Sequence, residues 1–247
     1  MSKEIIQSVP TNIITGFLGV GKTSAILHLL KNKPSDERWA VLVNEFGEIG
    51  VDGALLTADN SSKQGVFIRE VPGGCMCCAA GLPMQVALKQ LLQKAKPDRL
   101  LIEPTGLGHP EEILQVLSNK HYQAVLNLQK TLTLLDARNL QDTRYTNHDT
   151  FNQQIAIADT VVANKVDLYQ EEDKACLIEY VKARGQADVA IIFSKHGNID
   201  FAQLAGKTAI NVATPHSHHH HKTEKTLATE VPIPASGFIK AVNKGEG

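Results

Sequence analysis

Short runs of β-branched and aliphatic residues alternate along this chain with longer stretches in which Leu, Ile and Val recur at helical spacing. The short runs predict strands over residues 12–15, 39–44, 66–71, 99–103, 130–136, 160–164 and 189–194. The longer stretches predict helices over residues 22–31, 82–95, 110–119, 150–158 and 171–184. This alternation is typical of a mostly parallel sheet flanked by helices, so we predict an α/β fold. The G-x-x-x-x-G-K-[ST] motif at residues 16–23 makes the P-loop NTPase type of this fold the expected one.

The alternating pattern ends near residue 206, and the change divides the chain into three parts. Residues 1–206 hold the predicted strands and helices and form the main domain. Residues 207–236 contain a run of histidines at 216 and 218–221, and we interpret them as a His-rich linker. We favour a native metal-gathering role for this run, with an affinity tag or an inert linker as alternatives. Residues 237–247 predict one strand, which cannot bury a core alone. It is either the start of a truncated C-terminal domain or an addition to the main sheet.

The composition narrows the class of protein. Hydrophobic residues make up 43% and charged residues 21% of the 247 residues, as in ordinary soluble globular proteins. The formal net charge is −1 and the basic residues are scattered, which argues against binding to nucleic acid or to an anionic membrane surface. No segment approaches the roughly 18 apolar residues of a membrane span, and no signal peptide is visible. We expect a cytoplasmic protein.

The motif G-x-x-x-x-G-K-[ST] occupies residues 16–23, between the first predicted strand and the first predicted helix. Glycines in such a turn let backbone N–H groups approach the phosphates of a nucleotide at a helix N-terminus. We expect Lys22 to bind the β- and γ-phosphates and the Thr23 hydroxyl to bind Mg²⁺. The candidate nucleotide-binding residues of this segment are Gly16, Gly19, Val20, Gly21, Lys22, Thr23 and Ser24.

A second motif indicates which base is bound. Asn164, Lys165 and Asp167 form an Asn-Lys-x-Asp sequence at the end of a predicted strand. A carboxylate in that place can accept hydrogen bonds from both N1 and N2 of guanine, a donor pair that adenine lacks. The motif therefore predicts GTP and disfavours an ATP-dependent kinase on the same loop. Ser194 and Lys195, after the next strand, are candidates to close over the base.

A third candidate segment for nucleotide binding lies at the end of the strand predicted over residues 99–103. Glu103 can hold Mg²⁺ through water, and Gly106 can donate its backbone N–H to the γ-phosphate. An acid at a strand end can also serve only as a helix cap. With Lys22 and Thr23, these two residues complete the predicted catalytic set.

Three of the four cysteines lie within four residues, at Cys75, Cys77 and Cys78. Such crowding suits thiolate ligation of a metal in a reducing compartment better than a disulfide framework. The three thiolates can converge on one soft cation. Zn²⁺ fits with a fourth ligand from elsewhere, Cu(I) is an alternative, and Mg²⁺ is not expected here.

Several other residues are candidates for the remaining positions. Glu48 or Glu45 follows the second predicted strand, where a nucleotide-responsive switch loop usually lies, and either could reach the transition metal. Asp52 could approach Mg²⁺, and His109 is a further candidate ligand or proton carrier. Taken alone, an acid or a histidine in such a place is more often a solvated loop residue than a ligand. Cys176 stands alone in a predicted helix, and we expect it to be a small buried hydrophobe.

Five segments, taken in order, resemble the motifs of the CobW-type metallochaperone GTPases, relatives of the GTPases that serve urease and hydrogenase maturation. The segments are Gly-Phe-Leu-Gly-Val-Gly-Lys-Thr, Asn-Glu-Phe-Gly-Glu, Gly-Gly-Cys-Met-Cys-Cys, Glu-Pro-Thr-Gly and Asn-Lys-Val-Asp. The resemblance covers roughly residues 12–201. It implies metal ligation by Cys75, Cys77 and Cys78, guanine recognition by Asn164, Lys165 and Asp167, and phosphate and Mg²⁺ contacts from Gly19 through Thr23 with Glu103.

The resemblance also implies a function. A slow, Mg²⁺-dependent GTPase would hold a transition metal in its GTP-bound form and release it to a metal-requiring client protein on hydrolysis. Zinc is the favoured metal, and cobalt for cobalamin synthesis or a nitrile-hydratase-like client is an alternative. A zinc buffer or sensor with incidental GTPase activity is an alternative of another class. The family's smaller C-terminal domain, which contacts clients, is cut short here, and a nucleotide- or metal-dependent dimer is left open.

Overall fold

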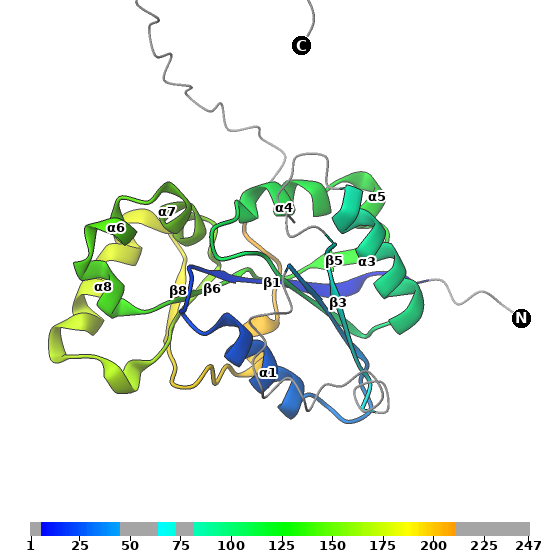
Figure 1. The fold of residues 1–247 in the computed structure, drawn as a ribbon, viewed down its shortest axis with the longest axis horizontal. Coiled ribbons are helices and arrows are strands. Elements are labelled where there is room, and N and C mark those ends of the chain that lie inside the picture. The colour runs from blue at the N-terminus through cyan, green and yellow to red at the C-terminus, as the bar shows by residue number, and fades with distance from the viewer. Residues whose placement is uncertain (1–5, 45–63, 73–81, 211–247) are drawn as a thin grey trace, which may run out of the picture. The chain divides into compact units, whose positions relative to one another are not determined.

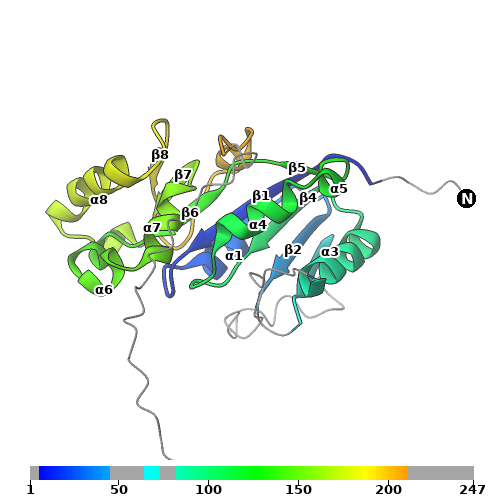
Figure 2. The same ribbon diagram turned by 90° about the horizontal axis from the view of Figure 1, so that it is seen from above.

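The structure is a computed structural model that describes residues 6–44, 64–72 and 82–210. Within these ranges the chain forms one sheet with helices on both of its faces (Figures 1 and 2). The chain divides into a unit over Met1–Thr214 and a second over Pro215–Gly247. The second unit falls outside the described residues, and with it most of the predicted linker and the predicted strand over 237–247.

Eight parallel strands make up the sheet in the described part of the chain. They follow the order β3-β2-β4-β1-β6-β7-β8, and β5 pairs with the first half of β1. Their bounds are β1 Val9–Gly16, β2 Trp39–Val43, β3 Val66–Glu70, β4 Arg99–Glu103, β5 Leu126–Leu128, β6 Leu132–Leu135, β7 Thr160–Ala163 and β8 Ala190–Phe193. The seven strands predicted from the sequence are all present, and the α/β fold is confirmed.

The helices that connect these strands lie where hydrophobic residues recur at helical spacing. The α-helices are α1 Lys22–Asn32, α3 Leu82–Ala95, α4 Pro110–Leu117, α5 Lys120–Gln123, α6 Thr143–Thr146, α7 Asp149–Ala156 and α8 Glu171–Arg184. The described ranges also contain three 3-10 helices, η3 Ala137–Gln141, η4 Val166–Leu168 and η5 Phe201–Leu204. All five predicted helices are confirmed. The sequence did not predict β5, α5 and α6, because elements of three or four residues are too short to show a period.

Alternate residues of the central strands point to opposite faces of the sheet and enter two separate hydrophobic clusters. Ile13 and Leu42 belong to a cluster that includes Leu88 of α3. Ile14, the neighbour of Ile13, belongs to a cluster on the other face that includes Leu29 of α1. Figure 1 shows α1 on one side of the sheet and α3 and α4 on the other. Both faces of the central strands are therefore covered, as a parallel sheet requires.

β1 is the strand that positions the candidate site. It pairs with β4, with Ile13 beside Ile102, and with β6, with Thr15 beside Thr133. Because all these strands are parallel, the carboxyl ends of β1, β4, β6 and β7 meet at one edge of the sheet. In open α/β sheets, ligands bind at this edge, where neighbouring connections leave in opposite directions.

One prediction about the helices is wrong. Cys176 was expected to be buried, but it is exposed. In α8 the buried residues are Asp173, Leu177 and Val181, which recur every four positions along one side of the helix. Cys176 lies outside that row, so it faces solvent. No helix in the described ranges combines the length and hydropathy needed to cross a membrane.

Candidate functional site

The loop between β1 and α1 is shaped by glycines that have no room for a side chain. A Cβ on Gly16 would lie 2.5 Å from the carbonyl oxygen of Leu134, and one on Gly21 would lie 2.6 Å from Nδ2 of Asn164. Both glycines also have positive φ, +141° and +96°. Gly16 thus lets the end of β1 touch β6, and Gly21 lets the start of α1 touch the end of β7.

The N-terminus of α1 faces the interior of this loop. Its N-cap residue is Gly21, and no side chain caps the helix there. The first backbone N–H groups of a helix have no partner within the helix and carry a partial positive charge, which favours an anion. Lys22 is 4% exposed, and its Nζ donates to the carbonyl oxygen of Phe17 at 3.3 Å. The loop therefore brings a buried cation and a helix N-terminus together, which is the arrangement that binds phosphate.

Thr23 and Glu103 come together although they are far apart in the sequence. The Thr23 hydroxyl donates to Oε1 of Glu103 at 3.3 Å, and Glu103 is 7% exposed at the end of β4. A cavity of about 270 Å³ opens beside Glu103 and Lys22, and its other walls are Leu18, Asn44, Pro104, Thr105, Gly106 and Leu107. Glu103 lines this cavity and contacts Thr23, and a hydroxyl and a carboxylate are oxygen donors of the kind that Mg²⁺ prefers.

Gly106 lies directly against the phosphate loop. A Cβ at this position would be 2.9 Å from the backbone nitrogen of Leu18 and 3.1 Å from the carbonyl carbon of Phe17. A side chain here would force the two loops apart. The backbone of the loop after β4 can therefore reach the same cavity as Lys22.

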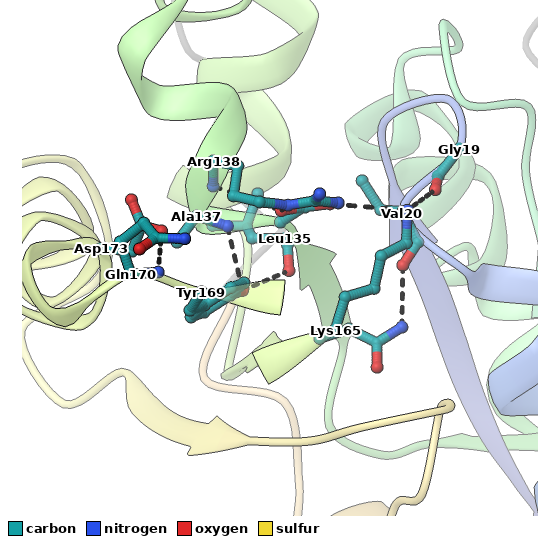
Figure 3. A network of polar contacts seen from close by, with 11 residues as sticks. Gly19, Val20, Leu135, Ala137, Arg138, Lys165, Tyr169, Gln170 and Asp173 are labelled. Carbon is teal, nitrogen blue, oxygen red and sulfur yellow. Dashed lines mark hydrogen bonds and ion pairs between the residues drawn. The ribbon is translucent and has the colours of Figure 1, made fainter. Parts of the chain in front are cut away.

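The Asn-Lys-x-Asp motif supports the phosphate loop from the other side. Asn164 is 2% exposed, and its Nδ2 donates to the carbonyl oxygen of Val20 at 2.9 Å. Its Oδ1 accepts from the backbone N–H of Gly197 at 3.1 Å. Lys165 Nζ donates to the carbonyl oxygen of Gly19 at 2.7 Å, a contact drawn in the upper right of Figure 3. Asp167 of η4 is exposed beside these two residues.

A buried carboxylate holds Lys165 in this position. Asp136 follows β6 and is 3% exposed, and its Oδ2 lies 2.6 Å from Nη2 of Arg138 and 3.5 Å from Nζ of Lys165. Burial alone would raise the pKa of Asp136. The hydrogen bonds and charge of Arg138, together with the charge of Lys165, outweigh burial and hold the pKa below its ordinary value. Asp136 is thus a carboxylate at neutral pH, and it neutralises charge beside the loop.

The same network fixes the segments on either side of Asp136 (Figure 3). The Tyr169 hydroxyl accepts from the backbone N–H of Ala137 at 2.9 Å, and burial raises the pKa of Tyr169 to about 12. Asp173 is 2% exposed, and its Oδ2 accepts from the backbone N–H of Gln170 at 2.7 Å, where α8 begins. The Tyr169 contact therefore joins the segment after β6 to the segment before α8, and the Asp173 contact fixes the first turn of α8.

Sequence reasoning missed residues that support the site. Asp136 ends a predicted strand, just as Glu103 does, and this shared position was a signal that could have found it. Gly197 follows β8, and a Cβ there would lie 2.6 Å from the backbone nitrogen of Ala25 in α1. Gln154 of α7 is fully buried, and its Nε2 donates to the carbonyl oxygen of Gly106 at 3.0 Å. No sequence signal marks Gly197 or Gln154, because both contacts join distant parts of the chain.

Other residues predicted for the site lie in the described ranges but do not line the cavity beside Lys22. Ser194 is 4% exposed, and its hydroxyl donates to the carbonyl oxygen of Asn198 at 2.7 Å. Lys195 and Ser24 are exposed. Nδ1 of His109 lies 2.9 Å from Oε1 of Gln153 on α7.

The predicted ligands of the transition metal lie outside the described residues. They are Cys75, Cys77, Cys78, Glu48 and Glu45, and Asp52 lies there as well. Within the ranges that are described, no three His, Cys, Asp or Glu side chains gather closely enough to hold a metal ion. The geometry reported above therefore concerns the nucleotide side of the site.

Comparison with known proteins agrees with this geometry. Residues 10–193 match the family model "CobW/HypB/UreG, nucleotide-binding domain". The zinc chaperone YeiR of Escherichia coli K12 is 46% identical over 240 residues, which are 96% of this chain and 71% of YeiR. The zinc chaperone YjiA of the same organism is 31% identical over 206 residues, 81% of this chain and 61% of YjiA.

A solved structure shows the same relationship. The crystal structure of Zn(II)-bound YjiA GTPase from E. coli superposes with a TM-score of 0.58 and 27% identity, covering 80% of this chain and 61% of that one. The chain thus spans about three fifths to seven tenths of the length of these relatives. The family match includes the phosphate loop, Glu103 and the Asn-Lys-x-Asp motif. The chain therefore belongs to the CobW/HypB/UreG nucleotide-binding family.

Proposed function

We propose that this chain is a Mg²⁺-dependent GTPase that carries zinc. In this proposal the GTP-bound form holds Zn²⁺ at Cys75, Cys77 and Cys78, and hydrolysis to GDP and phosphate releases the metal to a client protein. The observation that carries the proposal is the cavity beside Lys22, Glu103 and Gly106, together with the Asn-Lys-x-Asp motif bound to the same loop. The naming of YeiR and YjiA as zinc chaperones supports the choice of cargo.

Each residue of the loop has a defined task in this proposal. The N–H groups at the start of α1 and the ammonium of Lys22 bind the phosphates. Thr23 and Glu103 would hold Mg²⁺, which when bound neutralises charge on the β- and γ-phosphates. The carboxylate of Asp167 would accept hydrogen bonds from guanine. Asn164 and Lys165 of the same motif donate to backbone carbonyls of the phosphate loop and so hold it in place.

Gly106 would report whether the γ-phosphate is present. Its N–H can donate to a γ-phosphate oxygen, and this contact ends when hydrolysis removes the phosphate. A Cβ on Gly106 would lie 2.9 Å from a backbone atom of Leu18 and 3.1 Å from one of Phe17, so the two loops pack closely and we expect a shift of one to move the other. In this proposal the loop after β4 takes one position with GTP and another with GDP.

Zn²⁺ is the cargo in this cycle. Thiolates of Cys75, Cys77 and Cys78 would bind it, with Glu48 as the candidate fourth ligand. Coupling of about 1–3 kcal/mol between the nucleotide and the metal would change metal affinity by about 5- to 150-fold. Coupling of equilibrium affinities is reciprocal, so bound Zn²⁺ should tighten GTP binding by the same factor.

A competitive metal titration tests the proposal. The purified chain is titrated with Zn²⁺ and with Co²⁺ against a chelating dye, in Mg²⁺ with a non-hydrolysable GTP analogue or with GDP. We expect a tight site that appears with the GTP analogue and weakens with GDP, and the comparison of the two metals ranks zinc against cobalt. Equal affinity in both nucleotide states would reject nucleotide-gated carriage.

Two variants test the nucleotide site and the metal site separately. Lys22→Ala should abolish hydrolysis while the fold is retained, and Cys77→Ala should weaken metal binding while GTP still binds. If Cys77→Ala is folded and loses GTP affinity instead of metal affinity, the assignment of the cysteine is wrong. A turnover rate that neither metal nor client changes would favour a zinc buffer or sensor over a chaperone.

A further inference from the structure

Gln154 is a buried polar residue that has no task in the cycle described above. It lies in α7 and is 0% exposed. Its Nε2 donates to the carbonyl oxygen of Gly106 at 3.0 Å, and its own backbone carbonyl accepts from the Thr133 hydroxyl at 2.7 Å. Thr133 of β6 lies beside Thr15 of β1, one residue before β1 ends. Gln154 thus connects the sheet, where β1 enters the phosphate loop, to the loop after β4.

The contact fixes a particular peptide group. The carbonyl oxygen of Gly106 can only accept, so the amide nitrogen of Gln154 must face it. In a trans peptide the next N–H, that of Leu107, points away from the carbonyl and hence away from Gln154. Both Gly106 and Leu107 line the cavity that contains Lys22. Rotation of this peptide must therefore break the contact or move α7.

The helix that carries Gln154 also packs against the phosphate loop. The ring of Phe17 lies 5.8 Å from that of Phe151 in α7 and 5.0 Å from that of His148, the N-cap of α7, measured between ring centroids. Phe17 in turn provides the carbonyl oxygen that Lys22 contacts. Through these rings and through Gln154, α7 contacts both loops that border the cavity.

Packing alone does not account for an amide at this position. Oε1 of Gln154 is buried and has no hydrogen-bond partner among the described residues. An unpaired buried oxygen costs stability that an apolar side chain of similar volume would not. What the amide of Gln154 provides, and an apolar side chain would not, is the N–H group that donates to the carbonyl oxygen of Gly106.

We propose that Gln154 is a positioning residue that sets the Gly106–Leu107 peptide against the phosphate loop and couples α7 to the γ-phosphate. The inference rests on the proposed function, since Gly106 acts only when GTP is bound. Loss of the γ-phosphate contact should then alter the contact between Gly106 and Gln154, and so the environment of α7.

Gln154→Met tests this, because methionine keeps the length of the side chain and removes the donor. Gln93→Met is the control, since it makes the same change at an exposed position of another helix, α3. For Gln154→Met we expect kcat for GTP hydrolysis to fall about 10-fold or more, because a peptide group that is displaced from the reacting phosphate commonly has an effect of this size. GDP affinity should stay at the wild-type value, while the preference for a GTP analogue over GDP should fall about 5-fold or more. Gln93→Met should match wild type in all three.

A purely structural role would predict a different pattern. It would lower the unfolding midpoint and weaken GDP and the GTP analogue equally. That result, or wild-type kcat and nucleotide preference in folded Gln154→Met, would overturn the inference.

Hydrogen exchange of the wild-type chain gives a test that does not depend on the folding of a variant. Replacing GDP by the GTP analogue should protect peptides covering residues 104–109 and 150–156 together. Protection of the first without the second would also overturn the inference. If wild type neither hydrolyses GTP nor distinguishes its analogue from GDP, the proposed function fails, and the role of Gln154 fails with it.

Discussion

At the scale of single residues, the site depends on places where a side chain is absent. Gly16, Gly21 and Gly106 each lie so close to another segment that a Cβ would meet backbone or a buried amide at less than 3.0 Å. The sequence predicted the first two, because they belong to a motif of fixed spacing. It could assign Gly106 a contact with nucleotide, but not its contact with Leu18, because that depends on how two loops meet.

Gly197 and Gly19 allow the effect of crowding to be separated from that of backbone conformation. Their φ angles are nearly equal, +72° and +71°, but a Cβ on Gly197 would lie 2.6 Å from the nitrogen of Ala25, whereas one on Gly19 meets nothing within 4 Å. Alanine at Gly19 should therefore cost about 1 kcal/mol of the free energy of unfolding, from backbone strain alone. Alanine at Gly197 should cost about 1–3 kcal/mol more, because α1 must move. Urea denaturation of both variants measures the difference, and equal losses would contradict the crowding argument.

Tyr169 provides a prediction of pH dependence. Burial raises its pKa to about 12 from an ordinary value of 10.0. Between these values the unfolded chain loses the phenol proton while the folded chain keeps it, so the free energy of unfolding should fall as the pH rises. The contribution of Tyr169 is fully present below about pH 10. Urea denaturation at about pH 9 and about pH 11 should show a shallower fall for Tyr169→Phe than for wild type. Identical slopes would show that Tyr169 is not responsible.

At the scale of elements, the long helices and buried strands could be predicted and the short elements could not. α3 and α8 begin and end at the predicted residues, because their hydrophobic residues recur over several turns. β5 spans only Leu126–Leu128 and is defined by its pairing with β1. Its sequence carries no period, so only the assembled sheet reveals it.

The start of α8 depends on one buried carboxylate. Asp173 accepts from the backbone N–H of Gln170 at 2.7 Å and from Nε2 of Gln141 at 3.2 Å. Asp173→Ala should lower the free energy of unfolding by about 1–2 kcal/mol, as loss of a helix cap commonly does. Glu172→Ala is the control, because Glu172 is an exposed acid in the same helical turn. Chemical denaturation followed by circular dichroism measures both, and a loss in the control as large as that in Asp173→Ala would exclude the capping role.

At the scale of the whole molecule, the described core lies within one stretch of the chain. Both hydrophobic clusters draw their buried members from between Val9 and Leu204. The sequence anticipated this arrangement, since its alternating pattern ends near residue 206. It could not anticipate which distant segments meet at the site, because contacts such as those of Gln154 and Asp136 depend on the strand order.

We predict that Met1–Thr214, which is a compact unit by itself, folds without Pro215–Gly247. A chain that ends at Thr214 should unfold at the same urea concentration as the full chain and bind GDP with the same affinity. Equilibrium unfolding and a fluorescent-nucleotide titration of the two chains measure this. A lower midpoint for the shortened chain would mean that residues 215–247 stabilise the sheet.

The strand order also has a consequence for biosynthesis. The phosphate loop leaves the ribosome before β4 and β6, the neighbours that β1 needs, and before Asn164 and Gly197, which support the loop. A nascent chain that stops before Gly197 therefore lacks part of the support, although it already contains the whole glycine-rich motif. Since a ligand stabilises only the folded state that binds it, cellular GTP should protect the finished domain from proteases and leave incomplete products exposed to degradation.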